Sequence, residues 1–132
     1  MIAQRNSNMF EAEARISKSD LMDSLSFDDD AEGKFDVLVA NLPYVNPAWE
    51  GLDLRALEYE PRQALFALTE NGLSIYRRMF KELAERIDEP GFKYIVLEAD
   101  PCRHDDLAKI AQEYGWKLTK HKDYGLVFEP KA

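Results

Sequence analysis

The sequence has little of what marks exported or membrane-spanning proteins. Its 132 residues include one cysteine, Cys102, so no disulfide can form within the chain. No apolar run approaches the roughly 20 residues that a membrane span needs. The first residues lack the apolar segment of a signal peptide. These absences predict a soluble, cytoplasmic protein of a reducing compartment with no membrane partner.

Positive charge and closely spaced glycines are also scarce. The chain has 17 Lys and Arg against 25 Asp and Glu, a formal net charge of −8. That charge disfavours nucleic acid as a partner, because it repels the phosphate backbone. No two of the six glycines stand two apart, so no G-x-G turn exists. A nucleotide-like cofactor usually needs that turn, because glycine lets the backbone approach the ligand.

What is present fits one folded domain over residues 1–132. Hydrophobic residues make up 45% of the chain, which excludes a disordered tail. The length suits a single hydrophobic core, and no repeat or linker divides it.

Apolar periodicity predicts an α/β fold. Continuous apolar runs predict strands buried on both faces at 37–40 and 92–98. A shorter strand is expected at 14–17, and a tightly joined pair at 116–121 and 125–129. Helices are expected at 2–12, at 62–68, from Asn71 to a stop at 89–91, and around 107–114. The alternation predicts a mainly parallel sheet with a C-terminal antiparallel hairpin.

Ligands of such sheets bind beyond the carboxyl ends of the strands. This rule places Asp20, residues 41–45 and residues 98–101 on one functional rim.

The 41–44 loop (Asn41, Leu42, Pro43 and Tyr44) has the chemistry to bind a planar NH₂ group. Such a group offers two N–H donors, which the Asn41 side-chain oxygen and the Leu42 carbonyl could accept. Pro43 stiffens the loop and aims that carbonyl, and Tyr44 could stack on the planar group. A simple turn that ends the strand explains the same residues.

Three further places have two interpretations each. Asp20 could accept from an adenine amino group or a ribose hydroxyl, or it could cap a helix. Glu60, next to Pro61, could line the rim or be a first-turn carboxylate of a helix. Cys102 and His104 are better explained by an acidic helix N-terminus than by a metal site or a nucleophile.

Residues 35–44 resemble the fourth motif of class I S-adenosylmethionine-dependent amino-methyltransferases. There an apolar strand is followed by Asn-Pro-Pro-Tyr. Further segments are similar to the release factor glutamine methyltransferase (HemK-type) family, and the likeness runs from about Ala14 to the C-terminus. These segments are Tyr59-Glu60-Pro61 with Ala64-Leu65, Asn71-Gly72-Leu73 with Tyr76-Arg77, and Lys122-Asp123-Tyr124-Gly125.

The resemblance implies the C-terminal part of a Rossmann-like class I methyltransferase domain. It implies methyl transfer from S-adenosylmethionine to the side-chain amide of a glutamine in a peptide chain release factor. Asn41 and the Leu42 carbonyl would bind the amide, with Pro43 and Tyr44 beside it. Asp20 and Asn41 would face the cofactor, and Glu60 and Pro61 the substrate. No metal and no covalent intermediate are implied.

Two departures from the family pattern leave alternatives open. Leu42 replaces a proline, as in rRNA adenine dimethyltransferases, so an adenine amino group of RNA or DNA is an alternative substrate. The first strands and the glycine-rich loop of the family are missing, so the S-adenosylmethionine site is expected to be incomplete. A non-catalytic remnant or interaction module is therefore a second alternative.

The missing strands would leave the strand at 37–40 with an apolar edge, which invites pairing. The strand at 14–17 is expected to move in beside it, or a second copy or a complementing chain to cover it.

Overall fold

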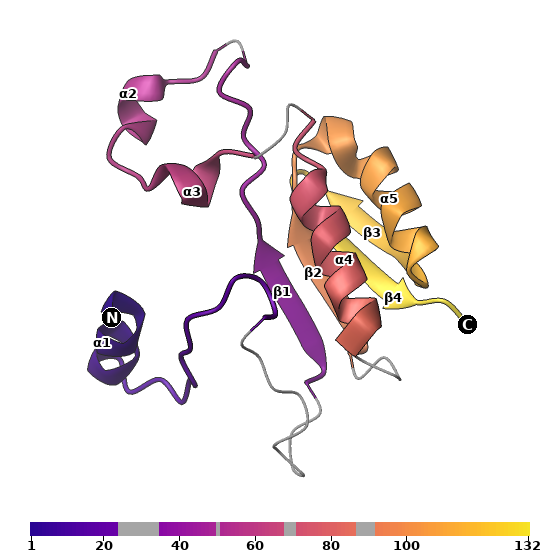
Figure 1. Cartoon of the computed structure of the whole chain (residues 1–132), viewed down its shortest axis with the longest axis horizontal. Coiled ribbons are helices and arrows are strands. Elements are labelled where there is room, and N and C mark those ends of the chain that lie inside the picture. Colours follow the sequence, from indigo (N-terminus) through magenta and orange to yellow (C-terminus); the bar gives the residue numbers. More distant parts are fainter. Residues whose placement is uncertain (24–34, 50, 68–70, 87–91) are drawn as a thin grey trace.

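The computed structural model describes residues 1–23, 35–49, 51–67, 71–86 and 92–132. A four-stranded sheet lies at its centre (Figure 1). The strands are β1 (Val37–Asn41), β2 (Tyr94–Glu98), β3 (Trp116–Lys122) and β4 (Gly125–Pro130), in the spatial order β1-β2-β4-β3. The helices are α1 (Ile2–Met9), α2 (Leu54–Leu57), α3 (Arg62–Leu65), α4 (Ser74–Arg86) and α5 (His104–Glu113), with a 3₁₀ turn η1 (Pro101–Arg103) before α5. The fold is therefore a mixed α/β fold, as predicted.

The sheet is mixed rather than mainly parallel. β1 pairs with β2 in parallel, whereas β4 pairs antiparallel with both β2 and β3. The C-terminal hairpin is therefore confirmed, but it enters the sheet with β4 beside β2. Only one parallel ladder remains among the described strands, so the prediction of a mainly parallel sheet is wrong for this part of the chain.

α4 and α5 cover one face of the sheet, as Figure 1 shows. The predicted apolar positions of α4 are buried at Tyr76, Phe80 and Leu83. Ile87 and the predicted stop at 89–91 lie outside the described residues. From the sheet, the alternate residues Ile95, Leu97, Leu126 and Phe128 point into the same core. Phe80 meets Phe128 edge to face, with ring centroids 5.7 Å apart.

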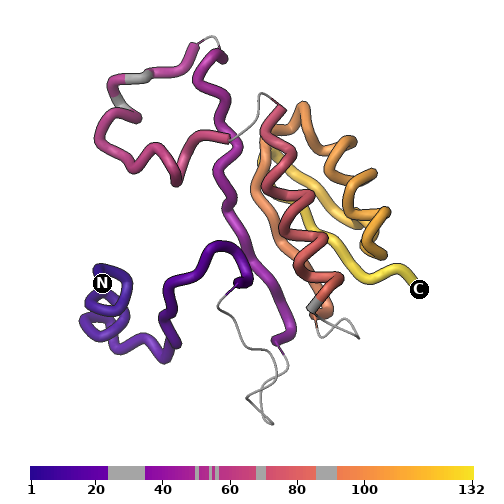
Figure 2. The backbone as a smooth tube through the Cα atoms, viewed as in Figure 1, coloured from indigo at the N-terminus to yellow at the C-terminus, as the bar shows by residue number. Residues whose placement is uncertain are grey.

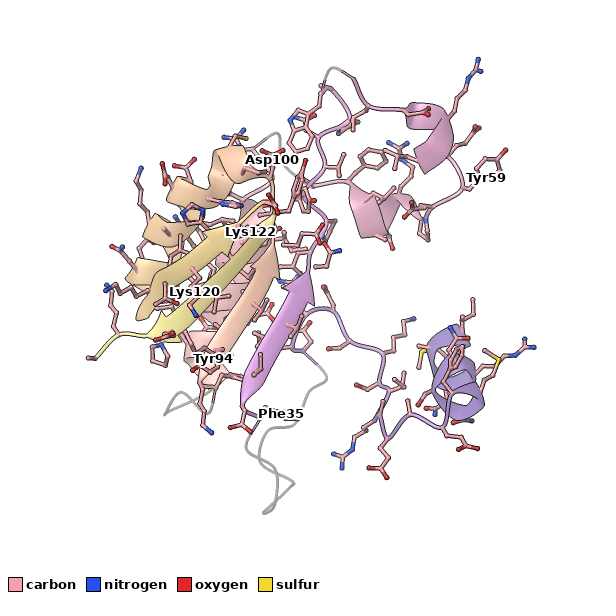
Figure 3. All side chains as sticks on the ribbon, turned by 180° about the vertical axis from the view of Figure 1, so that it is seen from behind. Phe35, Tyr59, Tyr94, Asp100, Lys120 and Lys122 are labelled. Carbon is pink, nitrogen blue, oxygen red and sulfur yellow. The ribbon has the colours of Figure 1, made fainter. Side chains whose placement is uncertain are left out.

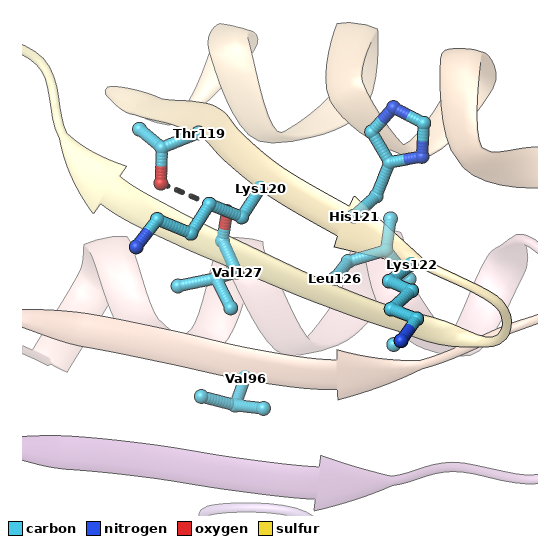
Figure 4. A pocket seen from close by; sticks show the side chains of 8 residues that line it. Val96, Thr119, Lys120, His121, Lys122, Leu126 and Val127 are labelled. Carbon is cyan, nitrogen blue, oxygen red and sulfur yellow. Dashed lines mark hydrogen bonds between the residues drawn. The ribbon is translucent and has the colours of Figure 1, made fainter.

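The opposite face of the sheet is not covered by any described helix. Val39 of β1 is 72% exposed, and Val37 and Tyr94 are exposed on the same side. Figure 3, seen from behind, shows Tyr94 with Lys120 and Lys122 on this face. A shallow groove runs across it between Val96 and the β3–β4 hairpin (Figure 4). The prediction that residues 37–40 are buried on both faces is therefore wrong, because the helices that cover the sheet in the described segments, α4 and α5, both lie on the opposite face.

Residues 14–17 form no strand and do not pair with β1. The chain beyond them is held against α4 instead. Met22 is buried in the core at 3% exposure, and its backbone N–H donates to Glu82 at 3.2 Å. The prediction that 14–17 fills the sheet edge is thus wrong, and β1 remains an edge strand among the described residues.

Helix α1 lies apart from the sheet in Figures 1 and 3. Its apolar residues Ile2 and Met9 are 79% and 63% exposed. No helix in the described segments has the length and apolar character to cross a membrane.

Candidate functional site

The 41–44 loop begins where the carboxyl ends of β1 and β2 lie side by side. Asn41, the last residue of β1, stands opposite Glu98, the last residue of β2. The two residues therefore share one rim of the sheet, as the sequence predicted. Residues 42–44 follow β1 without helix, strand or assigned turn.

Asn41 itself is exposed. Its carboxamide makes no hydrogen bond to another described residue. Its oxygen and its two N–H groups are therefore available to a ligand.

Tyr44 is held by the end of β2. Its hydroxyl donates to Oε1 of Glu98 at 3.0 Å. The hydroxyl of Tyr76, from α4, donates to the backbone carbonyl of the same Glu98. Burial, reinforced by the hydrogen bond and the charge of Glu98, raises the pKa of Tyr44 above its ordinary value. Tyr44 therefore keeps its proton and remains a donor at neutral pH.

Gly72 supports the loop from a third side. It is buried and has a φ of +67°, a conformation that favours glycine. A Cβ built at this position would lie 2.9 Å from the Tyr44 carbonyl oxygen. Any other residue would thus press on the backbone of the loop.

The sequence did not assign roles to Glu98, Tyr76 and Gly72. Glu98 was placed on the rim, Tyr76 was predicted on the apolar face of a helix and in the resemblance, and Gly72 was given a place only in the resemblance. Their roles depend on contacts over long separations: the bond from Tyr44 to Glu98 joins residues 54 positions apart. Only the position of Glu98 at a strand end gave a signal.

No hydrogen bond among the described residues joins Asp20 to Asn41. Its carboxylate pairs with Arg78 of α4, at 3.2 Å from one guanidinium nitrogen and 3.1 Å from the other. Arg78 also bonds Glu82 at 2.7 Å. Residues 21–23 form a turn and no helix, so the described residues do not show Asp20 capping one.

Glu60 and Pro61 lie on a separate lobe, residues 46–65, that leaves the sheet after β1 (Figure 2). An isolated bridge between Val45 and Phe66 closes its neck. Both residues are exposed, and Glu60 precedes the cap of α3 rather than lying in its first turn. No hydrogen bond or ion pair among the described residues joins Glu60 to the 41–44 loop.

His104 begins α5, whose first turn carries Asp105 and Asp106 as predicted, whereas Cys102 lies in the preceding turn η1. The Asp100 carboxylate accepts from the Cys102 backbone N–H at 2.9 Å. His104 is buried, with Nε2 3.2 Å from the Ala99 carbonyl oxygen. Across the described segments, no three His, Cys, Asp or Glu side chains are grouped as metal ligands.

Comparison with known proteins finds several relatives named release factor glutamine methyltransferase, although no family model matches the chain. The release factor glutamine methyltransferase of Fusobacterium nucleatum is 33% identical over 98 residues, which cover 73% of this chain and 27% of that protein. That of Bacteroides thetaiotaomicron is 31% identical over 113 residues, 84% of this chain and 38% of that protein. That of Flavobacterium psychrophilum is 26% identical over 121 residues, 91% of this chain and 40% of that protein.

The chain thus spans less than half the length of the curated relatives that it matches. The likeness nevertheless covers most of the chain and extends to several relatives of the same name. These matches show that the chain belongs to the release factor glutamine methyltransferase family and corresponds to part of the length of its members.

Proposed function

We propose that this chain provides the part of a release factor glutamine methyltransferase that binds the glutamine side-chain amide. The observation that carries the proposal is the state of Asn41. Its carboxamide is exposed and unbonded among the described residues, yet it stands on a loop whose other residues are held in place.

The loop would bind the amide through two acceptors. The Asn41 Oδ1 accepts one N–H of the glutamine amide, and the Leu42 carbonyl accepts the other. Pro43 limits the backbone between these acceptors and Tyr44. The contribution of the loop is orientation, which is worth several kcal/mol when a nitrogen must meet a reacting carbon in line.

The donor of the methyl group would be S-adenosylmethionine, but the described residues do not fit a complete site for it. The Asp20 carboxylate is already engaged by Arg78, and the sequence offers no G-x-G turn. We therefore propose that the cofactor site is completed outside these 132 residues. The parallel β1–β2 pair and the C-terminal hairpin support a Rossmann-like methyltransferase sheet of which this is a part.

The partner would be a peptide chain release factor, because the names of the relatives give a release factor as their substrate. The net charge of −8 supports a protein partner over RNA or DNA. Only Leu42 favours the alternative of an adenine amino group. Glu60 and Pro61, on the exposed lobe, are proposed to meet the protein beyond its glutamine. We propose a cytoplasmic location, which the single cysteine fits.

A complementation assay tests the proposal. The chain is mixed with the unmatched remainder of the Bacteroides thetaiotaomicron relative, and transfer of labelled methyl to a release factor is measured. We expect transfer by the mixture and none by the chain alone. Asn41→Ala should abolish it, whereas Asn8→Ala, on the distant helix α1, should leave it unchanged. Full activity of the Asn41→Ala mixture would remove Asn41 from the site.

The open sheet favours a second candidate, a non-catalytic interaction module. β1 has a free edge among the described residues, and one sheet face is uncovered. Calorimetric titration with S-adenosylmethionine separates the possibilities for the isolated chain. Micromolar binding would contradict the incomplete cofactor site. Failure of transfer with every complement would favour the interaction module.

A further inference from the structure

We infer that Glu98 is a positioning residue for the amide site: through Tyr44 it fixes the 41–44 loop and so sets the place of the Asn41 carboxamide. This inference rests on the proposed function. It adds a residue from a different strand, for which the sequence suggested no role.

Glu98 is well placed to act on the loop. It is the register partner of Asn41 in the parallel β1–β2 ladder. Residues paired in this way point to the same face of the sheet. The Glu98 carboxylate thus lies beside the base of the loop and accepts from the Tyr44 hydroxyl at its far end, three residues on.

Glu98 is itself fixed from two sides. Its backbone is paired with β1 and also with Gly125 of β4. Its carbonyl oxygen accepts from the hydroxyl of Tyr76, which is 1% exposed on α4. A side-chain substitution at Glu98 leaves these backbone contacts in place, so it removes the bond to Tyr44 selectively.

Apart from the packing of the Leu42 and Tyr44 side chains against the core, the other contacts near the loop act on the backbone. Gly72 packs against the Tyr44 carbonyl, and the Val45 N–H donates to the Leu65 carbonyl at 3.0 Å. Among the described residues, the bond from the Tyr44 hydroxyl to Glu98 is the one hydrogen bond made by a side chain of the 41–44 loop. An ionised acceptor strengthens such a bond. Glu98 is therefore the residue whose loss should loosen the loop while leaving the sheet intact.

Nuclear magnetic resonance of the whole chain tests this directly. The side-chain NH₂ signals of Asn41 and the ring signals of Tyr44 are compared between the wild type and Glu98→Ala. We expect both sets to shift or broaden in Glu98→Ala. Glu98→Gln should restore them, because the glutamine oxygen still accepts from the Tyr44 hydroxyl. Glu85→Ala, at an exposed site on α4, serves as the matched control and should change neither.

Tyr44→Phe provides the same test from the other partner. It removes the donor but keeps the ring, and it should reproduce the effect of Glu98→Ala on Asn41. A residue that only stabilised the sheet would lower the stability of the chain without selectively moving the Asn41 signals. This second variant decides the question even if Glu98→Ala fails to fold.

Ligand binding is measured in the same samples with a short acetylated peptide that contains one glutamine. The same peptide with glutamate in its place is the control. We expect the glutamine peptide to shift the Asn41 signals. Glu98→Ala should raise its dissociation constant about tenfold, which corresponds to roughly 1.4 kcal/mol, and Glu98→Gln should raise it less than about twofold.

Failure of the inference about Glu98 and failure of the proposed function would give different results. Unchanged Asn41 signals in both Glu98→Ala and Tyr44→Phe would overturn the role of Glu98 and leave the proposed function standing. A wild-type chain that ignores the glutamine peptide would contradict the proposed function. In that case the comparison of variants without peptide still shows whether Glu98 holds the loop.

Discussion

The Asn41 side chain makes no hydrogen bond to a described residue, whereas the backbone on either side of it is held in place. Asn41 ends a paired strand, and Tyr44, three residues later, is bonded to Glu98 and packed against Gly72. An exposed amide on a mobile loop would lose conformational entropy on binding. The surrounding contacts reduce that loss before any ligand arrives.

Gly72→Ala should be among the most destabilising changes at a glycine of this chain. The new Cβ would meet the Tyr44 carbonyl oxygen at 2.9 Å, and the φ of +67° adds strain. We expect it to lower the free energy of unfolding by about 2–3 kcal/mol, measured by urea denaturation.

Gly115→Ala is the matched control for that change. Gly115 also has a positive φ, +85°, but a Cβ there would have no atom within 4 Å. It should therefore show only the conformational cost, about 1 kcal/mol. Equal losses in the two variants would show that the approach to Tyr44 does not matter.

Two tyrosines, the buried Tyr76 and the half-buried Tyr44, predict a loss of stability at alkaline pH. Burial is the main cause that raises the pKa of both Tyr44 and Tyr76, with Glu98 adding to each. Because the folded-state pKa is raised, this contribution is complete below the ordinary tyrosine pKa of about 10 and is lost as the pH rises toward the folded-state value.

Urea denaturation between pH 8 and pH 11 would measure that loss. We expect the free energy of unfolding of the wild type to fall above about pH 10, and that of Tyr44→Phe to fall less steeply. Tyr59→Phe, at a side chain that is 91% exposed, should follow the wild type. Parallel pH profiles for all three proteins would contradict the prediction.

At the scale of elements, local patterns predicted α4, α5 and the hairpin well but did not predict α2. α4 and α5 have the expected buried faces, and β3 and β4 pair through a two-residue turn at Asp123 and Tyr124. The prediction for 37–40 was correct in secondary structure and wrong in burial. An apolar run indicates that a strand can be buried. Whether it is buried depends on whether other segments pack on each face of the sheet.

The segment at 20–23 shows which contact fixes an element without regular structure. Arg78 pairs with both Asp20 and Asp23, but these side chains are largely exposed. Such pairs contribute about 0–1 kcal/mol. Met22 is 3% exposed, and burial of such a side chain contributes about 1.5–3 kcal/mol. Apolar burial, rather than the ion pairs, is therefore expected to hold the segment.

Amide hydrogen exchange at residues 20–23 tests that comparison. Met22→Ala should increase exchange there and destabilise the chain by about 2–5 kcal/mol or release the segment alone. Arg78→Ala should change exchange much less, and 0.5 M salt should have little effect on the wild type. A larger effect of Arg78→Ala would reverse the assignment.

On the scale of the whole molecule, the described helices cover one side of the sheet. α4 and α5 bury one face, while Val37, Val39 and Tyr94 are exposed on the other, next to an edge of β1 that no described strand pairs with. An edge strand with apolar side chains promotes pairing with another chain. The proposed complement would cover both features at once.

Val39→Lys should therefore affect association more than stability. Val39 is 72% exposed in the isolated chain, so we expect a change of less than about 0.5 kcal/mol in its free energy of unfolding. In sedimentation velocity we expect the wild type to self-associate as its concentration rises, and Val39→Lys to do so less. Tyr59→Lys, at an exposed apolar side chain far from the sheet, is the control. A wild type that stays monomeric would count against the sheet edge as an interface.

Local sequence by itself determined α4, α5, the C-terminal hairpin and the chemistry of the 41–44 loop, because periodicity, turns and side-chain type act over a few residues. Only the tertiary structure decided that β1 is an edge strand among the described residues and that Asp20 pairs with Arg78. It also decided that Glu98 holds Tyr44. These pairings join residues 58 and 54 positions apart. Contacts at such separations depend on how the layers pack, which no short segment encodes.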